Sequence, residues 1–205
     1  QIKVIEDPHF NINKVNRLKK QELNDIFFNE SKILITIGRM TRQKNYSFLI
    51  KNFKKLTNKY KDIKLVIIGN GEEKDNLKSL IKELEISEKV KLIDFDLNIY
   101  KYLKKSNYFI STSIWEGSSL AMTDAAYMGI PILCSDCPSG RKEFIGNNER
   151  GFLYKQNNDE DFLKSFTDMY SLSPGEIKKL IIKAKKQTKK FTLFRSFLKL
   201  QEILN

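Results

Sequence analysis

The sequence lacks several features that would assign it to a class at once. No apolar run approaches the ~20 residues of a transmembrane helix, and the opening QIKVIEDPHF does not have the form of a signal peptide. Cys134 and Cys137 form a C-x-x-C pair, but His9 is the only histidine and there are no further cysteines. Because zinc needs four ligands, we expect two reduced thiols in a cytoplasmic protein rather than a metal or redox centre.

The chain also lacks internal repeats and low-complexity linkers, which favours one domain. Its 205 residues are 40% hydrophobic and 30% charged, enough for one good core. Lys and Arg number 37 against 25 Asp and Glu, a net charge of +12. This excess favours a polyanionic partner: nucleic acid, an anionic membrane or a phosphorylated ligand. Much of it lies in IKKLIIKAKKQTKK, where a solvated helix face is an equal alternative.

Short apolar runs alternate with amphipathic segments along most of the chain. The segments 46–56, 77–84, 99–103 and 120–128 have helical spacing, and the runs between them are almost continuously apolar. Such alternation predicts right-handed βαβ units and an α/β fold with a Rossmann-like, doubly wound parallel sheet. The predicted strands are 32–38, 63–69, 90–94, 108–112, 130–134 and 151–154.

The two ends of the chain have a different character. Ser173, Pro174 and Glu176 predict a helix start with a capping box, and a basic helix should continue to about residue 190. Thr192 is expected to cap a last helix. In the first thirty residues we expect a short strand at 2–5, a turn at 7–8 and a helix near 19–28.

The loop after the first strand, GRMTRQKNYSF, is rich in cations. Gly38 allows a sharp exit from the strand, and Arg39, Arg42 and Lys44 follow just before a helix. In such sheets ligands bind beyond the carboxyl ends of the strands, so this loop suits a diphosphate. A solvated loop with unrelated charges remains the alternative.

The loop after the second strand, GNGEE, is weaker evidence. Gly69 and Gly71 leave room for a ligand or for close packing. The loop is not a P-loop, because no G-K-[ST] follows, and Lys74 stands where G-x-G-x-x-G needs its third glycine.

The loop WEGSS, after the fourth strand, combines small residues with an acid. Gly117, Ser118 and Ser119 stand at the start of a helix, where unpaired N–H groups face an anion. Glu116 precedes them and Asp124 follows within the helix. Carboxylates would repel a diphosphate, so hydroxyls of a sugar or ribose are their expected targets. The alternative is a charge at the helix start and a surface aspartate.

In combination, these motifs resemble a known family. The order G-R-…-K-N, IIGNGEE, then E-G-x-x-L-…-A-…-GIP, SDCPSG, EFI and GFLY is similar to the C-terminal half of retaining family 4, or group 1, glycosyltransferases. The match runs from about Ile33 to Tyr154. The resemblance implies one of the two domains of a GT-B enzyme: an interdomain segment and domain start at 1–30, the nucleotide-sugar domain at 31–172, and helices at 173–205 that pack on the domain or cross back to its partner.

The resemblance also implies roles for single residues. Arg39, Lys44 and Glu116 would be catalytic, the two cations at the diphosphate and the acid at the transferred sugar. Asp124 takes the place of the family's second glutamate at the ribose and is one methylene shorter. Arg141, at a position where similar sequences commonly have proline, and Lys142 would extend the phosphate-binding surface. The implied donor-binding residues are Gly38, Arg39, Lys44, Asn70, Phe95, Asp96, Glu116, Gly117, Ser118, Ser119, Leu120 and Asp124.

The expected function is therefore retaining, metal-independent transfer from a nucleoside-diphosphate sugar, most simply a UDP-sugar, without a cofactor. The acceptor would be a glycan or lipid-linked acceptor of bacterial surface polysaccharide, bound by an N-terminal domain that this sequence lacks, so the 205 residues alone should not transfer sugar. The alternative is a nucleotide-binding module without transferase activity. A cytoplasmic location, with or without peripheral contact to an anionic membrane, is expected, and a nucleic-acid partner is not.

Overall fold

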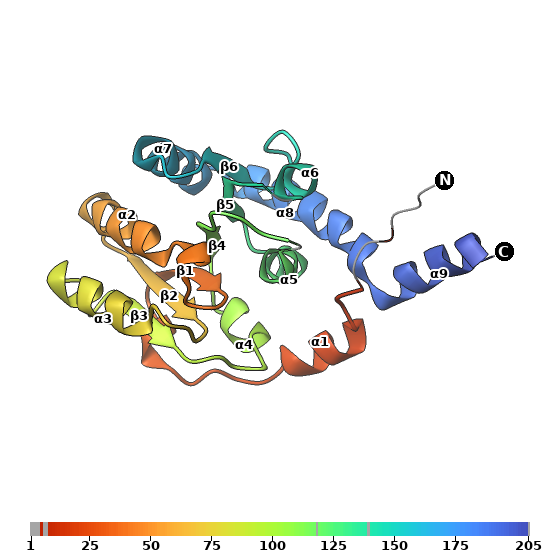
Figure 1. The fold of residues 1–205 in the computed structure, drawn as a ribbon, viewed down its shortest axis with the longest axis horizontal. Coiled ribbons are helices and arrows are strands. Elements are labelled where there is room, and N and C mark those ends of the chain that lie inside the picture. The colour runs from red at the N-terminus through yellow and green to blue at the C-terminus, as the bar shows by residue number, and fades with distance from the viewer. Residues whose placement is uncertain (1–4, 6–7, 118, 139, 205) are drawn as a thin grey trace.

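The structure is a computed structural model that describes residues 5, 8–117, 119–138 and 140–204. Its centre is a six-stranded parallel sheet with the strand order β3-β2-β1-β4-β5-β6 (Figure 1). All six predicted strands are present, close to their predicted boundaries. They are β1 (Lys32–Ile37), β2 (Ile63–Ile68), β3 (Val90–Ile93), β4 (Tyr108–Ser111), β5 (Ile132–Asp136) and β6 (Phe152–Lys155).

This strand order positions the site. The chain first builds the half-sheet from β1 to β3 and then returns to the other side of β1 with β4, so the direction of winding reverses between these two strands. Leu34 of β1 pairs with Tyr108 of β4, and Ile35 pairs with Phe109. A Rossmann-like sheet leaves a crevice at the carboxyl ends of the two strands that flank such a reversal.

Helices cover both faces of the sheet, each over its own core. One core includes α2 (Tyr46–Lys59), α3 (Lys74–Glu83) and α7 (Asp159–Tyr170). The opposite core receives residues from α1 (Ile12–Leu18), α4 (Tyr100–Leu103), α5 (Leu120–Met128), α6 (Arg141–Ile145) and α8 (Pro174–Thr188). The inner strands are buried on both faces, as their continuous apolar runs predicted.

The helix caps at the two ends of the chain test the sequence predictions. The capping box of Ser173 and Glu176 is present, and Thr192 Oγ1 accepts from the N–H of Arg195 at the start of α9 (Leu193–Leu204). The basic helix ends at Thr188 and continues as a 3-10 turn.

The predicted helix at 19–28 is wrong. Asn11 caps α1, which ends at Leu18, just where the predicted helix should begin, and Asp25 caps a separate 3-10 turn at Ile26–Phe28. These side-chain caps fix the boundaries where no clear periodicity exists. The helices α1, α6 and α7 were not predicted. The predicted strand at 2–5 and turn at 7–8 lie largely outside the described residues.

The N-terminal segment lies against the start of the C-terminal tail. The backbone N–H groups of His9 and Phe10 both donate to the carbonyl of Phe191, at 2.9 and 3.1 Å, and Phe10 forms a bridge with Thr192. From there α9 extends away from the sheet on the side of the N-terminus (Figure 1). Among the described residues, no helix has the length and apolar character needed to cross a membrane.

Candidate functional site

A cavity of about 370 Å³ opens at the carboxyl ends of β1 and β4, where the winding of the sheet reverses. Most residues predicted to bind a donor meet there although they come from distant parts of the sequence. Of the predicted set, its lining includes Gly38, Arg39, Lys44, Phe95, Glu116, Ser119, Leu120 and Asp124.

The GNG loop supports this cavity rather than lining it. A Cβ on Gly69 would lie 2.0 Å from the carbonyl oxygen of Gly38, and one on Gly71 would lie 2.2 Å from that of Met40. The N–H of Met40 donates to the carbonyl of Asn70 at 2.8 Å. The two glycines therefore allow the loop after β2 to pack directly on the loop after β1. Asn70 is among the predicted donor-binding residues but does not line the cavity.

Lys44 is held in place by the loop after β4. It ends a 3-10 turn at Arg42–Lys44, and the hydroxyl of Thr112 donates to its carbonyl at 2.8 Å. Next to it, the carbonyl of Gln43 accepts from the N–H of Ile114 at 2.8 Å. These bonds fasten the two loops to each other, so the backbone of Lys44 moves with the loop that bears Glu116.

The side chains of Lys44 and Glu116 form an ion pair inside the cavity. Lys44 Nζ donates to Glu116 Oε1 at 2.6 Å, and the side chains are 18% and 7% exposed. Ser113 Oγ donates to the same oxygen at 2.6 Å. Arg39, by contrast, is exposed at the rim, and no other described residue pairs with its guanidinium. Two cations are thus available to an anion: Arg39, and Lys44 if it leaves Glu116.

The sequence suggested that Arg141 extends a phosphate-binding surface, but in the structure this side chain is buried instead. Its side chain is 1% exposed, and its NH2 donates to Ser111 Oγ at 2.7 Å and to Glu116 Oε1 at 3.2 Å. Its NH1 donates to Ser135 Oγ at 2.8 Å. Arg141 is the first residue of α6, and its side chain lies against Ser111 of β4 and Ser135 of β5, where it contacts Glu116. Lys142 is exposed and pairs with Asp136.

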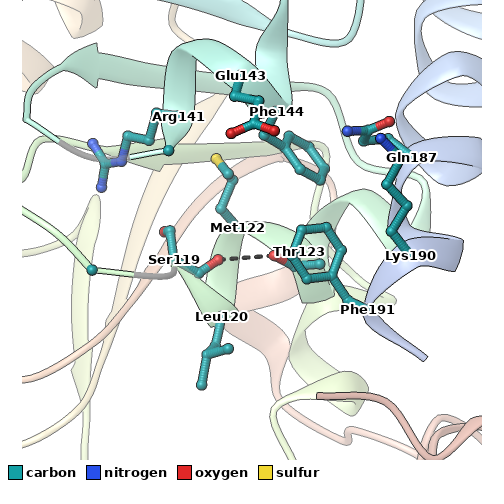
Figure 2. Close-up of a pocket in the computed structure, with 12 residues that line it drawn as sticks. Ser119, Leu120, Met122, Thr123, Arg141, Glu143, Phe144, Gln187, Lys190 and Phe191 are labelled. Atoms are coloured by element: carbon teal, nitrogen blue, oxygen red, sulfur yellow. Dashed lines mark hydrogen bonds between the residues drawn. The ribbon is translucent and has the colours of Figure 1, made fainter. Parts of the chain in front are cut away.

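The start of α5 faces both this cavity and a second one of about 320 Å³. Ser119 is the N-cap but its side chain makes no capping bond, so the first N–H groups of the helix have no side-chain partner there. Ser119 and Leu120 line both cavities, whereas Gly117 lines only the second. In Figure 2 the second cavity lies between α5 and the aromatic rings of Phe144 and Phe191. Ser118 lies outside the described residues.

Asp124 is buried, 3% exposed, and is not the surface residue that the alternative reading of its spacing suggested. Its Oδ1 accepts from the Tyr100 hydroxyl at 2.7 Å, and its Oδ2 lies 2.8 Å from His9 Nε2. Burial and the negative charge of Asp124 raise the pKa of Tyr100 well above its usual range, so the phenol stays protonated and donates.

Asp96, also predicted at the donor, does not line the cavity although its neighbour Phe95 does. Its carboxylate accepts from Lys101 at 2.7 Å, from the Tyr102 hydroxyl at 2.9 Å and from the N–H of Asn98 at 2.7 Å. Burial acts to raise the pKa of the Asp96 carboxyl, but these hydrogen bonds outweigh it and hold the pKa below its usual value.

Sequence reasoning missed three contributors to the site. Arg141 was assigned to the wrong surface, Tyr100 was noted only as part of a helix, and His9 only as a lone histidine. None had a local signal, because each acts through an acid more than twenty residues away in the sequence. The assembled cavity can bind an anion at Arg39, Lys44 and the start of α5, and hydroxyl groups at the two acids.

Cys134 and Cys137 are both buried, and neither forms a disulfide bond with a described residue. Burial raises the pKa of the Cys134 thiol to about 12, which keeps it protonated and unreactive.

The chain is similar to known glycosyltransferases in sequence. The model of the family "Glycosyl transferases group 1" matches residues 19–188. An uncharacterised glycosyltransferase of Methanocaldococcus jannaschii is 37% identical over 139 residues, 66% of this chain and 34% of the relative. The N-acetylgalactosamine-N,N'-diacetylbacillosaminyl-diphospho-undecaprenol 4-alpha-N-acetylgalactosaminyltransferase of Campylobacter jejuni is 34% identical over 160 residues, 78% of this chain and 43% of the relative. The chain therefore spans about two fifths of these relatives, or less.

Solved structures confirm the predicted fold. Staphylococcus aureus TarM, in a complex that includes UDP, superposes with a TM-score of 0.77 at 24% identity, over 90% of this chain and 37% of TarM. HepE from Anabaena in complex with UDP superposes with a TM-score of 0.78 at 15% identity, over 95% of this chain and 53% of HepE. At these identities the likeness concerns the fold, which is the Rossmann-like half of a GT-B structure.

Proposed function

This chain belongs to the group 1 glycosyl transferases, and we propose that it is the donor-binding part of a retaining, metal-independent enzyme. The donor is a nucleoside-diphosphate sugar, and the UDP in the two structures of similar fold favours a UDP-sugar. The acceptor is a glycan or a lipid-linked glycan of a bacterial surface polysaccharide, as the name of the Campylobacter jejuni relative suggests.

One observation supports this function most: Arg39, Lys44 and Glu116 share one cavity at the point where the sheet reverses its winding. In the proposed complex Arg39 grips phosphate oxygens and Lys44 leaves Glu116 for the diphosphate. Glu116 then accepts hydrogen bonds from hydroxyls of the transferred sugar.

The proposed acceleration of sugar transfer comes from stabilising the negative charge on the leaving diphosphate. As the bond between the sugar and the diphosphate breaks, negative charge develops on the leaving group. Arg39, the released Lys44 and the N–H groups at the start of α5 would stabilise this charge without a metal ion. The ribose lies toward Asp124, and Phe95 lies against the base.

Titration of the purified chain with UDP-, GDP- and ADP-sugars tests the proposal. We expect binding of a UDP-sugar that persists in EDTA, and we expect Lys44→Met to weaken UDP binding about 10- to 100-fold, since a charge-assisted hydrogen bond contributes ~1.5–3 kcal/mol. Lys78→Met, which removes an exposed lysine on α3, is the matched control. Absence of binding by every nucleotide sugar would sink the proposal.

The contact between Asp124 and the ribose has its own test. If the carboxylate holds ribose hydroxyls, Asp124→Asn should reduce the preference for UDP over 2'-deoxy-UDP. An unchanged preference would mean that His9 and Tyr100 are the sole partners of this acid.

A nucleotide-binding module without transferase activity is the second candidate. It is favoured by aspartate at position 124, where the family pattern has glutamate. A transfer assay with the full-length protein separates the two, because only the first candidate predicts product with the anomeric configuration of the donor. For the 205 residues alone we expect donor binding without turnover.

We further propose that the acceptor-binding part of the protein packs on α9. Its Phe194, Phe197 and Leu200 are between 45% and 68% exposed, and the helix points away from the sheet beside the N-terminal segment (Figure 1). Phe197→Ser should weaken the association of separately expressed halves.

A second partner in the proposal is an anionic surface of the cytoplasmic membrane. A groove between α8 and α9 is lined by five cations, one acid and one leucine: Lys186, Lys189, Lys190, Arg195, Lys199, Glu202 and Leu198. Such a cluster attracts acidic lipids. Sedimentation with vesicles tests this, because equal binding to neutral and acidic vesicles would contradict an electrostatic contact.

A further inference from the structure

Arg141 is a cation that is buried in the protein interior. Its side chain is 1% exposed and lies below the carboxyl ends of β4 and β5, where it donates to Ser111 Oγ, Ser135 Oγ and the carbonyl of Ser135. Burial of a guanidinium is unfavourable unless a carboxylate and hydrogen bonds compensate it. The carboxylate that it reaches is that of Glu116, at 3.2 Å.

Glu116 therefore has two cations for one negative charge. Its Oε1 accepts from Lys44 at 2.6 Å and from Arg141 at 3.2 Å, with Ser113 Oγ as a third donor at 2.6 Å. Counting formal charges, Lys44, Arg141 and Glu116 carry a net charge of +1. The cluster has one positive charge to spare for an incoming anion.

Only one of the two cations can reach that anion. Lys44 lines the donor cavity, is 18% exposed and has a long flexible stem. Arg141 does not line the donor cavity and is fixed by the two serines. Although it contributes to the wall of the second cavity, its guanidinium points away from Phe144 and Phe191 there (Figure 2).

The departure of Lys44 would be unfavourable without Arg141. Glu116 is 7% exposed, so a carboxylate left with only the Ser113 hydroxyl would be buried without a counter-charge. Glu116 would then retain Lys44, and the anion would have to compete for it. With Arg141 in place, Glu116 stays paired when Lys44 leaves.

We propose that Arg141 is a positioning residue: it is the permanent counter-ion of Glu116 and thereby releases Lys44 to bind the diphosphate of the donor. The inference rests on the proposed function, because it presumes that the anion in the cavity is a nucleoside diphosphate. It assigns Arg141 no contact with the donor.

The first test compares UDP with uridine as ligands of the chain, by calorimetry for UDP and by NMR titration for uridine. Arg141→Met should weaken UDP binding about tenfold and leave uridine binding unchanged, since uridine has no phosphate for Lys44. Arg150→Met is the matched control, because Arg150 also contacts the α6 region but hydrogen-bonds the carbonyls of Glu143 and Phe144 instead of Glu116. It should bind UDP like the unmodified chain.

The second test distinguishes release of Lys44 from a structural role. Adding Glu116→Gln to Arg141→Met removes the carboxylate that retains Lys44, so UDP affinity should return to within about threefold of that of Glu116→Gln alone. A damaged fold would not be repaired by this change. Failure of the second substitution to restore UDP binding, or an Arg141→Met variant that binds UDP normally, would overturn the inference.

A structure of the unsubstituted chain with UDP gives an independent answer if Arg141→Met does not fold. Lys44 Nζ should then lie on a phosphate oxygen while Arg141 stays within hydrogen-bond distance of Glu116. Arg141 on a phosphate, or Lys44 still on Glu116, would contradict the inference. If the unsubstituted chain binds no nucleoside diphosphate at all, the proposed function fails instead.

Discussion

The two acids at either end of the EGSSLAMTD segment have opposite surroundings. Glu116, before α5, accepts from two cations and a hydroxyl, and one of these cations faces the cavity. Asp124, eight positions later, meets no lysine or arginine among the described residues but has Tyr100 and His9 as partners. The two acids therefore differ in kind. Glu116 belongs to an ionic cluster in which Lys44 can leave for another anion, whereas Asp124 belongs to a fixed hydrogen-bond network.

The difference indicates a division of labour. Charges around Glu116 can rearrange when an anion arrives, because Lys44 is partly exposed and mobile in its stem. The contacts of Asp124 join three separate segments: α5, α4 through Tyr100, and the N-terminal segment through His9, whose backbone is bonded to Phe191. We therefore expect changes at Glu116 to alter sugar transfer with little loss of stability, and changes at Asp124 to lower stability in addition to any effect on ribose recognition.

The largest effect is expected from Glu116→Gln in the full-length protein. Sugar transfer should fall by about 10²- to 10³-fold, the range typical for loss of one preorganised electrostatic contact to the reacting group. UDP affinity should not fall, because Lys44 is released. Product formation and UDP binding are measured on the same samples, with Glu160→Gln on α7 as control. If Glu116→Gln weakened UDP binding, the proposed difference between Glu116 and Asp124 would be contradicted.

The next largest effect is expected from Asp124→Ala on stability. The free energy of unfolding should fall by ~2–3 kcal/mol, since the buried Tyr100 hydroxyl loses a charged acceptor. Urea denaturation measures the change. Asp94→Ala, at an exposed carboxylate that pairs with Lys74, should lower it by less than ~1 kcal/mol. Equal losses in the two variants would show that Asp124 has no special structural role.

A smaller loss, ~0.5–1.5 kcal/mol, is expected for His9→Ala, because His9 is partly exposed and contributes one hydrogen bond to Asp124. Repeating the substitution in the Asp124→Ala background completes a double-mutant cycle. The loss should nearly vanish there. If His9→Ala lowered the free energy of unfolding equally in both backgrounds, His9 would stabilise the fold through its packing on Phe10 instead.

The smallest effect concerns a third acid, Asp96, whose pKa in the folded chain is lowered by its hydrogen bonds from Lys101, Asn98 and Tyr102. A lowered pKa stabilises the fold above the unfolded value of 3.8, and this stability is lost as the pH falls through the folded pKa. Asp96→Asn should therefore flatten the decrease in stability below about pH 4 and leave UDP binding nearly unchanged. Stability is measured by urea denaturation at a series of pH values. If Asp96→Asn lost as much stability at acidic pH as the unsubstituted chain, this prediction would be contradicted.

Much of the fold could be predicted because its signals are local. Continuous apolar runs marked all six strands, and Ser173 with Glu176 marked the start of α8. The helix wrongly expected at 19–28 shows the limit: the segment has no strong periodicity, so single caps at Asn11 and Asp25 decided its structure.

The part of the site that follows from the sheet topology was predictable. Because the predicted sheet is parallel, the loops with Lys44 and Glu116 were expected at the same sheet edge, and the structure then showed that β1 and β4 are neighbours. The position of Arg141 was not predictable, because the direction of its side chain depends on a turn after β5 and on serines of two strands. A cation at the end of a strand gives the same local signal whether it faces solvent or the core.

By itself the sequence determined the six strands, the helices α2 to α5 and α8, the cationic loop after β1 and the acids Glu116 and Asp124, because these follow from hydrophobic periodicity and residue type. Only the tertiary structure decided what each acid touches. Hydrogen bonds and ion pairs depend on distances of a few ångströms between segments far apart in the sequence, such as His9 and Asp124, which are 115 positions apart. Glu116 thus received a second, buried counter-ion, and Asp124 received a tyrosine and a histidine.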